Sequence, residues 1–380
     1  MEQLLKIIEA KHEKMVAFLE KLVNIDSGND CPEGVAKVAR MIGEKLQEMK
    51  FSVEYMDIPG ACTHLLATRK GDSNKEVMII GHMDTLFPVG TVAVRPFTIK
   101  EDKAYGPGVL DMKGGITIAL FAMEALYETG WNDKNITIFF AGDEEFAHPK
   151  TNAPVLFEKY ARGKDAVFNM ETASAGKAVL VGRKGNIHPE LIVRGISAHA
   201  GADLDKGASA VVELAHKIIA VNKLTDKSRG LTFNCGVIKG GTVANAVPDY
   251  ASVIIDMRYL TDEDGADGIE NLRKIAAESI IPGTTAEVGN LRERFAPMAV
   301  TEANLKLYEL VKAQGEKLGL DIDKKIGGGS SDSGWTVRAG APSLCSMGAL
   351  GALNHSDREY IELAGLVERA KLLALSVDAV

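Results

Sequence analysis

Residues 135–145, NITIFFAGDEE, combine a predicted strand with a cluster of acidic side chains. A run of apolar residues, typical of a buried strand, stops at Ala141 and Gly142 and is followed at once by three carboxylates, Asp143, Glu144 and Glu145. Like charges that lie close together repel one another and raise one another's pKa. We therefore expect either that something offsets these charges or that all three lie in water.

The composition limits the class of protein. The chain has 380 residues, of which 46% are hydrophobic and 25% charged, and this suits one large or two moderate globular domains. The formal net charge is −8 and the sequence contains no basic patch, so we expect no nucleic-acid partner. No stretch approaches the roughly 18 uninterrupted apolar residues of a membrane span, so we expect no membrane partner.

The first residues and the cysteines favour a cytoplasmic location. Residues 1–25 carry apolar side chains at helical spacing and lack the basic start and apolar block of a signal peptide, so they predict a packed helix. The four cysteines lie far apart without a CxxC motif, which favours reduced thiols. They are Cys31, Cys62, Cys235 and Cys345.

Strands and helices alternate in the first part of the chain, which predicts an α/β domain with layers and a largely parallel sheet. The expected helices cover residues 35–49 and 114–130. The expected strands cover residues 51–55, 65–68, 77–80 and 136–140.

The pattern changes near Gly185. A strand, a helix over residues 209–221, two strands, a helix over 268–280 and a strand over 286–291 follow in the β-α-β-β-α-β order of a ferredoxin-like unit. After about Pro297 the α/β pattern returns, with helices expected over 302–318 and 361–377. We therefore predict a split catalytic domain, residues 1–184 and 297–380, with an inserted domain at 185–296.

Histidine and acidic side chains follow several of the predicted strands. Ligands collect beyond the carboxyl ends of strands in open α/β sheets. Each such residue alone is more often structural or solvated, but two histidines together with several carboxylates are the ligands of a two-metal site. Two cations there would also offset the charges in AGDEE. The candidates are His82, Asp84, Asp111, Glu144, Glu145, Glu171 and His355.

Spacing suggests different roles for neighbours. In an extended segment, residues two apart face the same way, so Asp84 can reach the second ring nitrogen of His82 and orient it. Glu144 and Glu145 are adjacent and point in different directions. One of them can bind metal while the other remains a free base.

Together these motifs resemble the carboxypeptidase G (glutamate carboxypeptidase) branch of the dinuclear zinc peptidase family, which also holds aminoacylases and succinyl-diaminopimelate desuccinylases. The resemblance spans nearly the whole chain, in the family's order. It rests on GHMDT, AYGPGVLDMKGG, AGDEE, METASAGK, SAHAG, GGTVANAVPDYASVIIDMRY, GGGSSDSG and LNHSD.

The resemblance implies two Zn²⁺ per subunit, with Co²⁺ or Mn²⁺ as substitutes. His82 and Glu171 would bind the first zinc, Glu145 and His355 the second, and Asp111 would bridge the two. Asp84 would orient His82.

The implied reaction is metal-assisted amide hydrolysis. Glu144 would take a proton from water held between the metals and later give it to the departing amine. Position 171 is Glu, which resembles the carboxypeptidases and acyl-amino-acid hydrolases of the family. Aminopeptidase and dipeptidase relatives tend to have Asp at this position.

The resemblance also implies that the inserted domain forms a homodimer and a lid. His199 would stabilise the oxyanion in the partner's active site, and Asn245 and Arg294 would contact the substrate, Arg294 holding a carboxylate. Arg292 is an alternative to Arg294. The backbone around Gly328, Gly329 and Ser330 would bind the same end of the substrate.

Purely structural roles for the lid residues remain alternatives to the roles that the resemblance implies. His199 would then be a satisfied loop histidine, and Asn245 would shape the loop before Pro248. Arg258 is interpreted as a structural partner of a nearby carboxylate, although related enzymes place a substrate-contacting arginine near this position.

The expected substrate is a small amide or peptide with a free carboxylate, from which a C-terminal amino acid is released. The segment GGGSSDSGW departs from the shorter glycine-threonine-aspartate form of glutamate-releasing relatives, which leaves the released residue open. An N-acyl-amino-acid amidohydrolase and a dipeptidase remain alternatives. A catalytically silent metal-binding or interaction protein is a further one, against which the complete ligand set and Glu144 argue.

Overall fold

The computed structural model describes residues 1–174 and 177–380, so Ala175 and Gly176 of the METASAGK motif lie outside the described residues. The chain forms two compact units. Unit 1 comprises Met1–Gly182, Val300–Gly327 and Ser331–Val380, and unit 2 comprises Arg183–Ala299 with Gly328–Ser330. The short glycine-rich segment thus groups with unit 2, although the flanking chain belongs to unit 1.

A six-stranded sheet forms the centre of unit 1. Its order is β1-β2-β6-β3-β7-β17, and β6, β3, β7 and β17 run parallel to one another, as the sequence predicts. Strand β2 pairs antiparallel with both β1 and β6. The strands cover Ser52–Asp57 (β1), Thr63–Arg69 (β2), Glu76–His82 (β3), Asn135–Ala141 (β6), Ala166–Asn169 (β7) and Ser343–Leu344 (β17).

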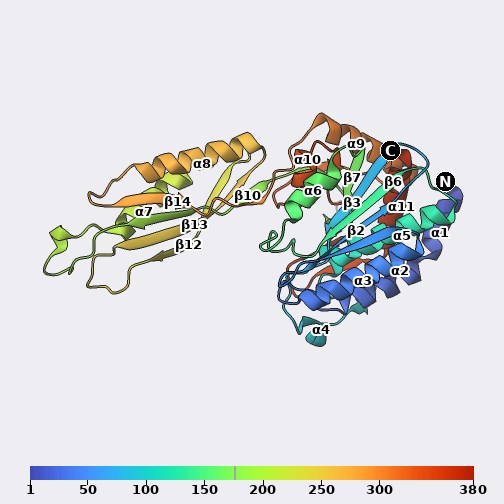
Figure 1. The fold of residues 1–380 in the computed structure, drawn as a ribbon, viewed down its shortest axis with the longest axis horizontal. Coiled ribbons are helices and arrows are strands. Elements are labelled where there is room, and N and C mark those ends of the chain that lie inside the picture. Colours follow the sequence, from blue (N-terminus) through green and yellow to red (C-terminus); the bar gives the residue numbers. More distant parts are fainter. Residues whose placement is uncertain (175–176) are drawn as a thin grey trace. The chain divides into compact units, whose positions relative to one another are not determined.

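Helices cover both faces of this sheet, which makes unit 1 a layered α/β domain. In Figure 1, helix α5 (Gly114–Glu128) and helix α6 (Ala153–Ala161) lie on opposite sides of the strands. Side chains of β6 alternate between the two layers. Phe140 belongs to the large core that includes α5, whereas the ring of Phe139 packs against Phe157 of α6 with 4.8 Å between centroids. Helix α6 was not among the helices predicted from the sequence.

The N-terminal segment forms two helices where one was expected, α1 (Glu2–Ala10) and α2 (His12–Val23). At the break, the buried ammonium group of Lys11 contacts Glu124 at 2.8 Å and Glu128 at 2.6 Å, both on α5. Further helices of unit 1 are α3 (Pro32–Glu48), α4 (Thr91–Val94), α9 (Glu302–Lys317), α10 (Ser333–Arg338) and α11 (Leu363–Ala379).

Smaller strands complete unit 1. A five-stranded sheet has the order β4-β5-β19-β18-β8, and β16 pairs with β9. They cover Thr98–Lys100 (β4), Lys103–Tyr105 (β5), Ala173–Ser174 (β8), Val179–Arg183 (β9), Lys324–Gly327 (β16), Leu350–Ala352 (β18) and Tyr360–Glu362 (β19).

Unit 2 has the ferredoxin-like fold that the sequence predicts. Its strands and helices follow the order β11, α7, β12, β13, α8, β14, and the antiparallel sheet has the order β14-β11-β13-β12. The short strands β10 and β15 extend it beside β13. The bounds are Gly185–Ile187 (β10), Glu190–Arg194 (β11), Ala210–Asn222 (α7), Thr232–Gly240 (β12), Tyr250–Tyr259 (β13), Asp262–Ala277 (α8), Thr285–Gly289 (β14) and Glu293–Phe295 (β15).

Helix α8 begins at Asp262, earlier than the expected residue 268. Thr261 caps it, because its side chain accepts the backbone N–H of Asp264.

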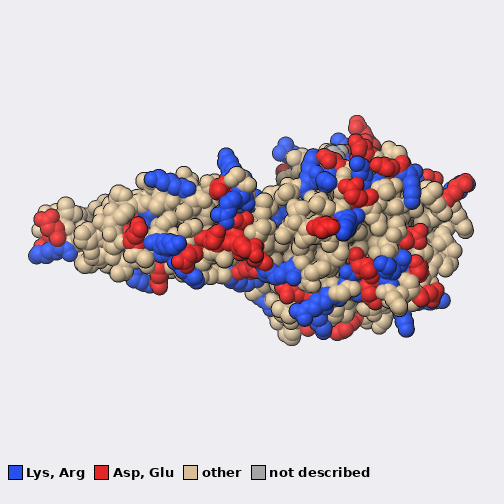
Figure 2. Space-filling model, turned by 90° about the horizontal axis from the view of Figure 1, so that it is seen from above, with Lys and Arg blue, Asp and Glu red and all other residues tan. Residues whose placement is uncertain are grey.

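Charged side chains of both signs lie on the surface. On the face drawn in Figure 2, basic and acidic side chains are interspersed and no continuous basic surface forms. Among the described residues, no helix is both long and apolar enough to cross a membrane.

Candidate metal centre

The main sheet brings three of the predicted acidic and histidine segments to one edge. Strands β6, β3 and β7 lie side by side and parallel, with His82 opposite Ala141 and Ile80 opposite Asn169. The residues that follow these strands, Glu144, Glu145 and Glu171, therefore emerge at the same edge as His82.

The first candidate group consists of His82, Asp111 and Glu171, whose ligand atoms lie within 4.8 Å of one another. Nε2 of His82 lies 3.1 Å from Asp111 Oδ1 and 3.6 Å from Glu171 Oε1. All three side chains are buried. Burial alone would lower the pKa of His82, but Glu144, Asp111 and Asp84 outweigh it and raise that pKa well above its usual value.

The second candidate group consists of Asp111, Glu145 and His355, again with ligand atoms within 4.8 Å of one another. Nε2 of His355 lies 3.2 Å from Asp111 Oδ2 and 3.2 Å from Glu145 Oε2. Hydrogen bonds to these two carboxylates raise the pKa of His355 to about 11, although burial opposes the shift.

Asp111 is common to both groups, with one carboxylate oxygen facing each histidine. Burial would raise its pKa, but the contacts with His355, His82 and Asn354 lower the pKa of Asp111 below its usual range. A carboxylate that presents one oxygen to each of two ligand groups has the geometry of a bridge between two cations.

Two residues that hold Asp111 in place were not predicted. Nδ2 of Asn354 donates to Asp111 Oδ2 at 3.0 Å. The buried Glu359 accepts the backbone N–H groups of Gly108, Leu110 and Asp111, at 3.2, 2.8 and 2.9 Å. Asn354 adjoins His355 in the LNHSD motif, which was an available signal, whereas no sequence pattern marks Glu359.

Asp84 contacts both His82 and the backbone of the AGDEE segment. Nδ1 of His82 lies 3.1 Å from the backbone oxygen of Asp84 and 3.4 Å from its carboxylate oxygen Oδ1. In the neutral ring, an acceptor at Nδ1 places the proton there, and Nε2 then offers its lone pair to a cation held by the first group. The two carboxylate oxygens accept the backbone N–H groups of Glu144 and Glu145, each at 3.0 Å.

Glu144 and Glu145 differ as their adjacency predicts. Glu145 belongs to the second ligand group, while Glu144 belongs to neither group and lies 3.9 Å from Nε2 of His82. Burial is the main reason that the pKa of Glu144 is raised well above its usual value; Glu171, Asp332 and Glu145 add to the rise and His82 opposes it. A carboxyl group with a raised pKa beside the ligands can both take up and release a proton.

Asp143, the first acid of AGDEE, has a different partner from the one we expected. Its Oδ1 lies 2.8 Å from Nδ1 of His148, whose Nε2 lies 2.8 Å from Asp332 Oδ1. Burial opposes the charge of His148, but Asp332 and Asp143 raise its pKa to about 10. Metal charge is therefore not needed to offset Asp143, and the sequence-based explanation of the three acids was incomplete.

A third group, Cys62, His64 and Asp143, also has its ligand atoms within 4.8 Å of one another. Nδ1 of His64 accepts the backbone N–H of Gly142 at 3.0 Å, which places the ring proton on Nε2. Burial raises the pKa of the Cys62 thiol and keeps it protonated. Neither ring nitrogen then offers a lone pair, so this third group does not suit a metal ion.

Unit 2 carries the predicted lid residues His199 and Asn245, and it places them next to each other. His199 forms a β-bridge with Ala246, and the N–H of Ala200 donates to the backbone oxygen of Asn245 at 3.0 Å. Both His199 and Asn245 are exposed.

Arg294 lies on β15 and is half-buried. The backbone oxygens of Gly328 and Gly329 accept hydrogen bonds from Arg258 at 3.1 Å and from Arg183 at 2.8 Å. Arg258 also pairs with Asp256 at 3.0 Å, in agreement with its structural interpretation. Ser330 is half-buried beside these glycines.

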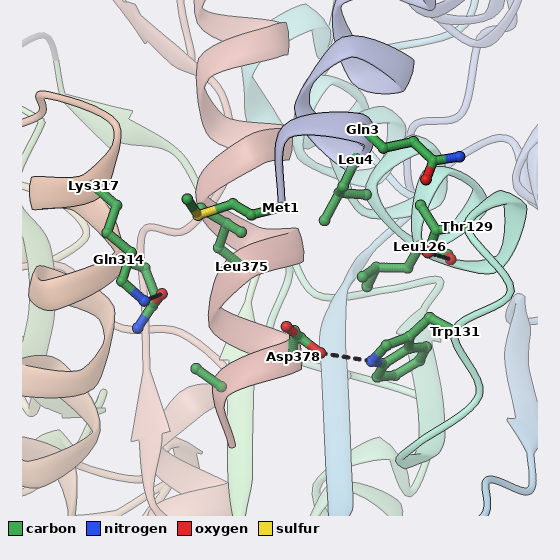
Figure 3. Close-up of a pocket in the computed structure, with 11 residues that line it drawn as sticks. Met1, Gln3, Leu4, Leu126, Thr129, Trp131, Gln314, Lys317, Leu375 and Asp378 are labelled. Atoms are coloured by element: carbon green, nitrogen blue, oxygen red, sulfur yellow. Dashed lines mark hydrogen bonds between the residues drawn. The ribbon is translucent and has the colours of Figure 1, made fainter.

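A cavity of about 410 Å³ lies elsewhere in unit 1 (Figure 3). Trp131 and Asp378 lie on its wall and are joined by a hydrogen bond of 2.8 Å. None of the candidate ligands lines this cavity, so it is separate from the metal centre. Its lining residues are Met1, Gln3, Leu4, Leu126, Thr129, Trp131, Gln314, Lys317, Leu375, Asp378 and Ala379.

Comparison with known proteins agrees with this geometry. Residues 78–379 match Peptidase family M20/M25/M40. The chain belongs to this peptidase family. Carboxypeptidase G2 from Pseudomonas sp. (strain RS-16) is 31% identical over 367 residues, which cover 95% of this chain and 88% of that protein.

More distant members extend the comparison. A succinyl-diaminopimelate desuccinylase from Nitrosomonas eutropha is 25% identical, with 89% of this chain and 92% of that protein covered. An aminopeptidase structure from Bacillus cereus shares the fold, with a TM-score of 0.81, 21% identity and coverage of 97% and 98%. So does an M20 family metallo-carboxypeptidase from Sulfolobus solfataricus, with a TM-score of 0.76, 18% identity and coverage of 96% and 98%.

Membership of this family confirms the resemblance inferred from the motifs. The protein is a hydrolase that acts on peptide or amide bonds, and the family implies the use of a divalent metal. The two ligand groups at the edge of the main sheet are the candidate place for that metal.

Proposed function

We propose that this protein is a dinuclear zinc hydrolase that removes a C-terminal amino acid from N-acyl amino acids or small peptides by cleaving the amide bond. The observation that carries the proposal is the sharing of Asp111 between two ligand groups, His82 with Glu171 and Glu145 with His355.

The donor atoms suit zinc. Imidazole nitrogens and carboxylate oxygens are common zinc ligands, and each group offers one histidine and two carboxylates. When bound, such cations lower the pKa of water and polarise the scissile carbonyl. Co²⁺ and Mn²⁺ accept the same donors, so either is a reasonable substitute.

Glu144 is the proposed base. It lies beside both ligand groups without belonging to either, and its backbone N–H is fixed by Asp84 at 3.0 Å. In the proposed reaction its carboxylate takes the proton of the attacking water and the resulting carboxyl group gives that proton to the departing amine.

His199 is proposed to stabilise the developing oxyanion. Its Nδ1 accepts the backbone N–H groups of Gly201 at 3.2 Å and Ala202 at 3.1 Å. This places the ring proton on Nε2, so the exposed histidine presents a hydrogen-bond donor, which an oxyanion requires.

We further propose a homodimer in which His199 serves the partner's active site. Strand β12 pairs with β13 and forms an edge of the described sheet, and its residues Val237 and Ile238 are exposed. Exposed edges of this kind favour pairing with an identical edge about a twofold axis.

A subunit-exchange assay tests the shared site. We expect His199→Ala and Glu144→Gln each to inactivate the protein. In a mixed dimer, one site carries both defects and the other carries neither. Activity should return on mixing, to about half per mixed dimer if the sites act independently. Absence of recovery after confirmed exchange would place His199 within its own chain's site or give it a structural role.

The proposed substrate carries a free carboxylate on its C-terminal residue. Arg294 and the backbone of Gly328–Ser330 are proposed to hold this carboxylate. The similarity to carboxypeptidase G2 supports release of a C-terminal residue, and the similarity to desuccinylases supports an N-acyl substituent on the other side of the amide.

A substrate panel tests the proposal. N-acyl amino acids and dipeptides with varied C-terminal residues are compared with their C-terminal amides, using the zinc-loaded protein. We expect the free acids to be hydrolysed far better, and Arg294→Ala to remove that preference. Preference for dipeptides with a free amino group would indicate a dipeptidase. No hydrolysis of any amide by fully metallated protein would refute the function.

A further inference from the structure

His148 links the loop that carries Glu144 and Glu145 to another part of unit 1. The residue is 1% exposed, and its two ring nitrogens each lie 2.8 Å from a carboxylate oxygen, Nδ1 from Asp143 and Nε2 from Asp332. A carboxylate only accepts, so both nitrogens donate and the ring is a cation held between two anions. The proposed reaction uses none of these three groups.

The backbone beside His148 is held in an unfavourable conformation. Ala147 and His148 have φ values of 58° and 53°, in the left-handed region that residues with a Cβ rarely adopt. Two backbone hydrogen bonds close the loop, from Ala147 to Glu144 at 2.6 Å and from His148 to Asp143 at 2.9 Å. Such a conformation persists when surrounding contacts fix it, and the two bonds of the imidazole are contacts of this kind.

On its other side, His148 contacts the start of α10. Asp332 occupies the N-terminal cap position of this helix but makes no side-chain capping bond, and its Oδ1 receives His148 instead. The next residue, Ser333, accepts a hydrogen bond from Asn169 at 2.9 Å, and Asn169 Oδ1 accepts the N–H of Glu171 at 3.3 Å. A chain of contacts thus runs from the AGDEE loop to a ligand of the first group.

We propose that His148 is a positioning residue that fixes Glu144 and Glu145 by tying Asp143 to Asp332. This rests on the proposed two-metal function, because its purpose is to place the base and one ligand of that site. A contribution to stability alone does not explain why His148 lies between Asp143 and Asp332. Replacing buried ions by apolar residues of similar volume is often neutral or stabilising.

The test uses His148→Gln, which keeps a donor but cannot reach two carboxylates on opposite sides at once. The control is Ile42→Ala, a change at a fully buried residue of α3 outside this network. Both variants are characterised by thermal unfolding, by kcat and KM, and by titration of metal-free protein with Co²⁺ followed by visible absorption.

We expect kcat of His148→Gln to fall by about tenfold or more with KM within about threefold, because misplaced reacting groups lose rate rather than affinity. The dissociation constant for the weaker Co²⁺ site should rise by about 10–100-fold, the usual effect of removing a group that orients a ligand. The control should change neither quantity at a temperature where it remains folded.

Unchanged kcat and unchanged Co²⁺ affinity in folded His148→Gln would overturn the proposal, as would equal losses in the control. If His148→Gln does not fold, His148→Leu combined with Asp143→Asn and Asp332→Asn removes all three charges together, and the same losses are expected. The Co²⁺ titration needs no substrate. If the wild-type protein hydrolyses nothing, the proposed function fails while the positioning role is still decided by metal affinity.

Discussion

The carboxylate of Asp84 accepts the backbone N–H of Glu144, with 3.0 Å between Oδ1 and the nitrogen. The other oxygen accepts the N–H of Glu145 at the same distance, while the backbone oxygen of Asp84 lies 3.1 Å from Nδ1 of His82. One residue therefore orients a ligand of the first group, a ligand of the second group and the proposed base.

Replacing Asp84 should consequently disturb the whole site. In Asp84→Asn, one oxygen becomes an NH₂ group that faces an N–H donor, so one anchor of the AGDEE loop is lost. We expect metal affinity to fall by about 10–100-fold, measured by titration with Co²⁺.

A matched control for this change is Asp165→Asn. Asp165 accepts the backbone N–H of Glu76 at 2.8 Å, at the opposite end of β3. The control should retain wild-type metal affinity. Equal losses in both variants would mean that Asp84 acts only through the general stability of the sheet.

Glu144→Gln should keep both metals and lose turnover. The amide preserves shape and removes the proposed base, and loss of a general base typically lowers kcat by about 10²–10⁴-fold. The comparison is Glu145→Gln, which should lose metal, since Glu145 belongs to the second ligand group. Metal analysis beside a rate assay separates them, and loss of a metal from Glu144→Gln would show that the roles are reversed.

Metal binding should release protons near neutral pH. Without a cation, the contacts with Asp111 and Glu145 raise the pKa of His355 to about 11, and that of His82 is also raised, so both rings hold an extra proton at pH 7. A ring nitrogen must lose its proton to bind metal, so the apparent affinity should weaken as pH falls.

Calorimetric titration in two buffers with different ionisation enthalpies measures this release. We expect about two protons, one from each histidine, to be released for each pair of cations bound at pH 7. The same heat in both buffers would contradict the protonation states inferred for His82 and His355.

The contribution of His148 to stability should depend on pH in a defined direction. Its folded-state pKa is raised to about 10, above the value of about 6.5 expected in the unfolded chain. A raised pKa stabilises the folded protein fully below the unfolded-state value, and this contribution is lost as pH rises through the folded-state value.

The difference in unfolding free energy between wild type and His148→Gln should therefore be largest below about pH 6.5 and shrink toward pH 10. Urea unfolding of the two metal-free proteins across this range measures it, and titrating groups that do not interact with His148 cancel in the difference. A difference that stays constant or grows with pH would exclude an imidazolium at this position.

The fold was predictable because its signals are local. The strand ending at Ala141 and the helices α3, α5 and α9 follow from apolar spacing, and the order of unit 2 follows from alternating patterns. The errors have physical causes. Helix α8 begins with acidic residues that carry no apolar periodicity, and the break at Lys11 depends on carboxylates of a distant helix, Glu124 and Glu128.

The candidate site was predictable as a set of residues, because strand ends bring His82, Glu145 and Glu171 to one edge of a parallel sheet. The contacts made by the residues that support these ligands could not be predicted from the sequence. Glu359 reaches the backbone of Asp111, and Asp332 reaches His148, across long stretches of chain without any motif. Only the folded structure brings such pairs together.

The central claim is that Asp111 bridges two cations, and anomalous scattering at the zinc absorption edge tests it most directly. We predict that crystals of the zinc-loaded protein show two anomalous peaks flanking Asp111, one against His82 and Glu171 and the other against Glu145 and His355. A single peak, or peaks that do not share Asp111, would contradict the account.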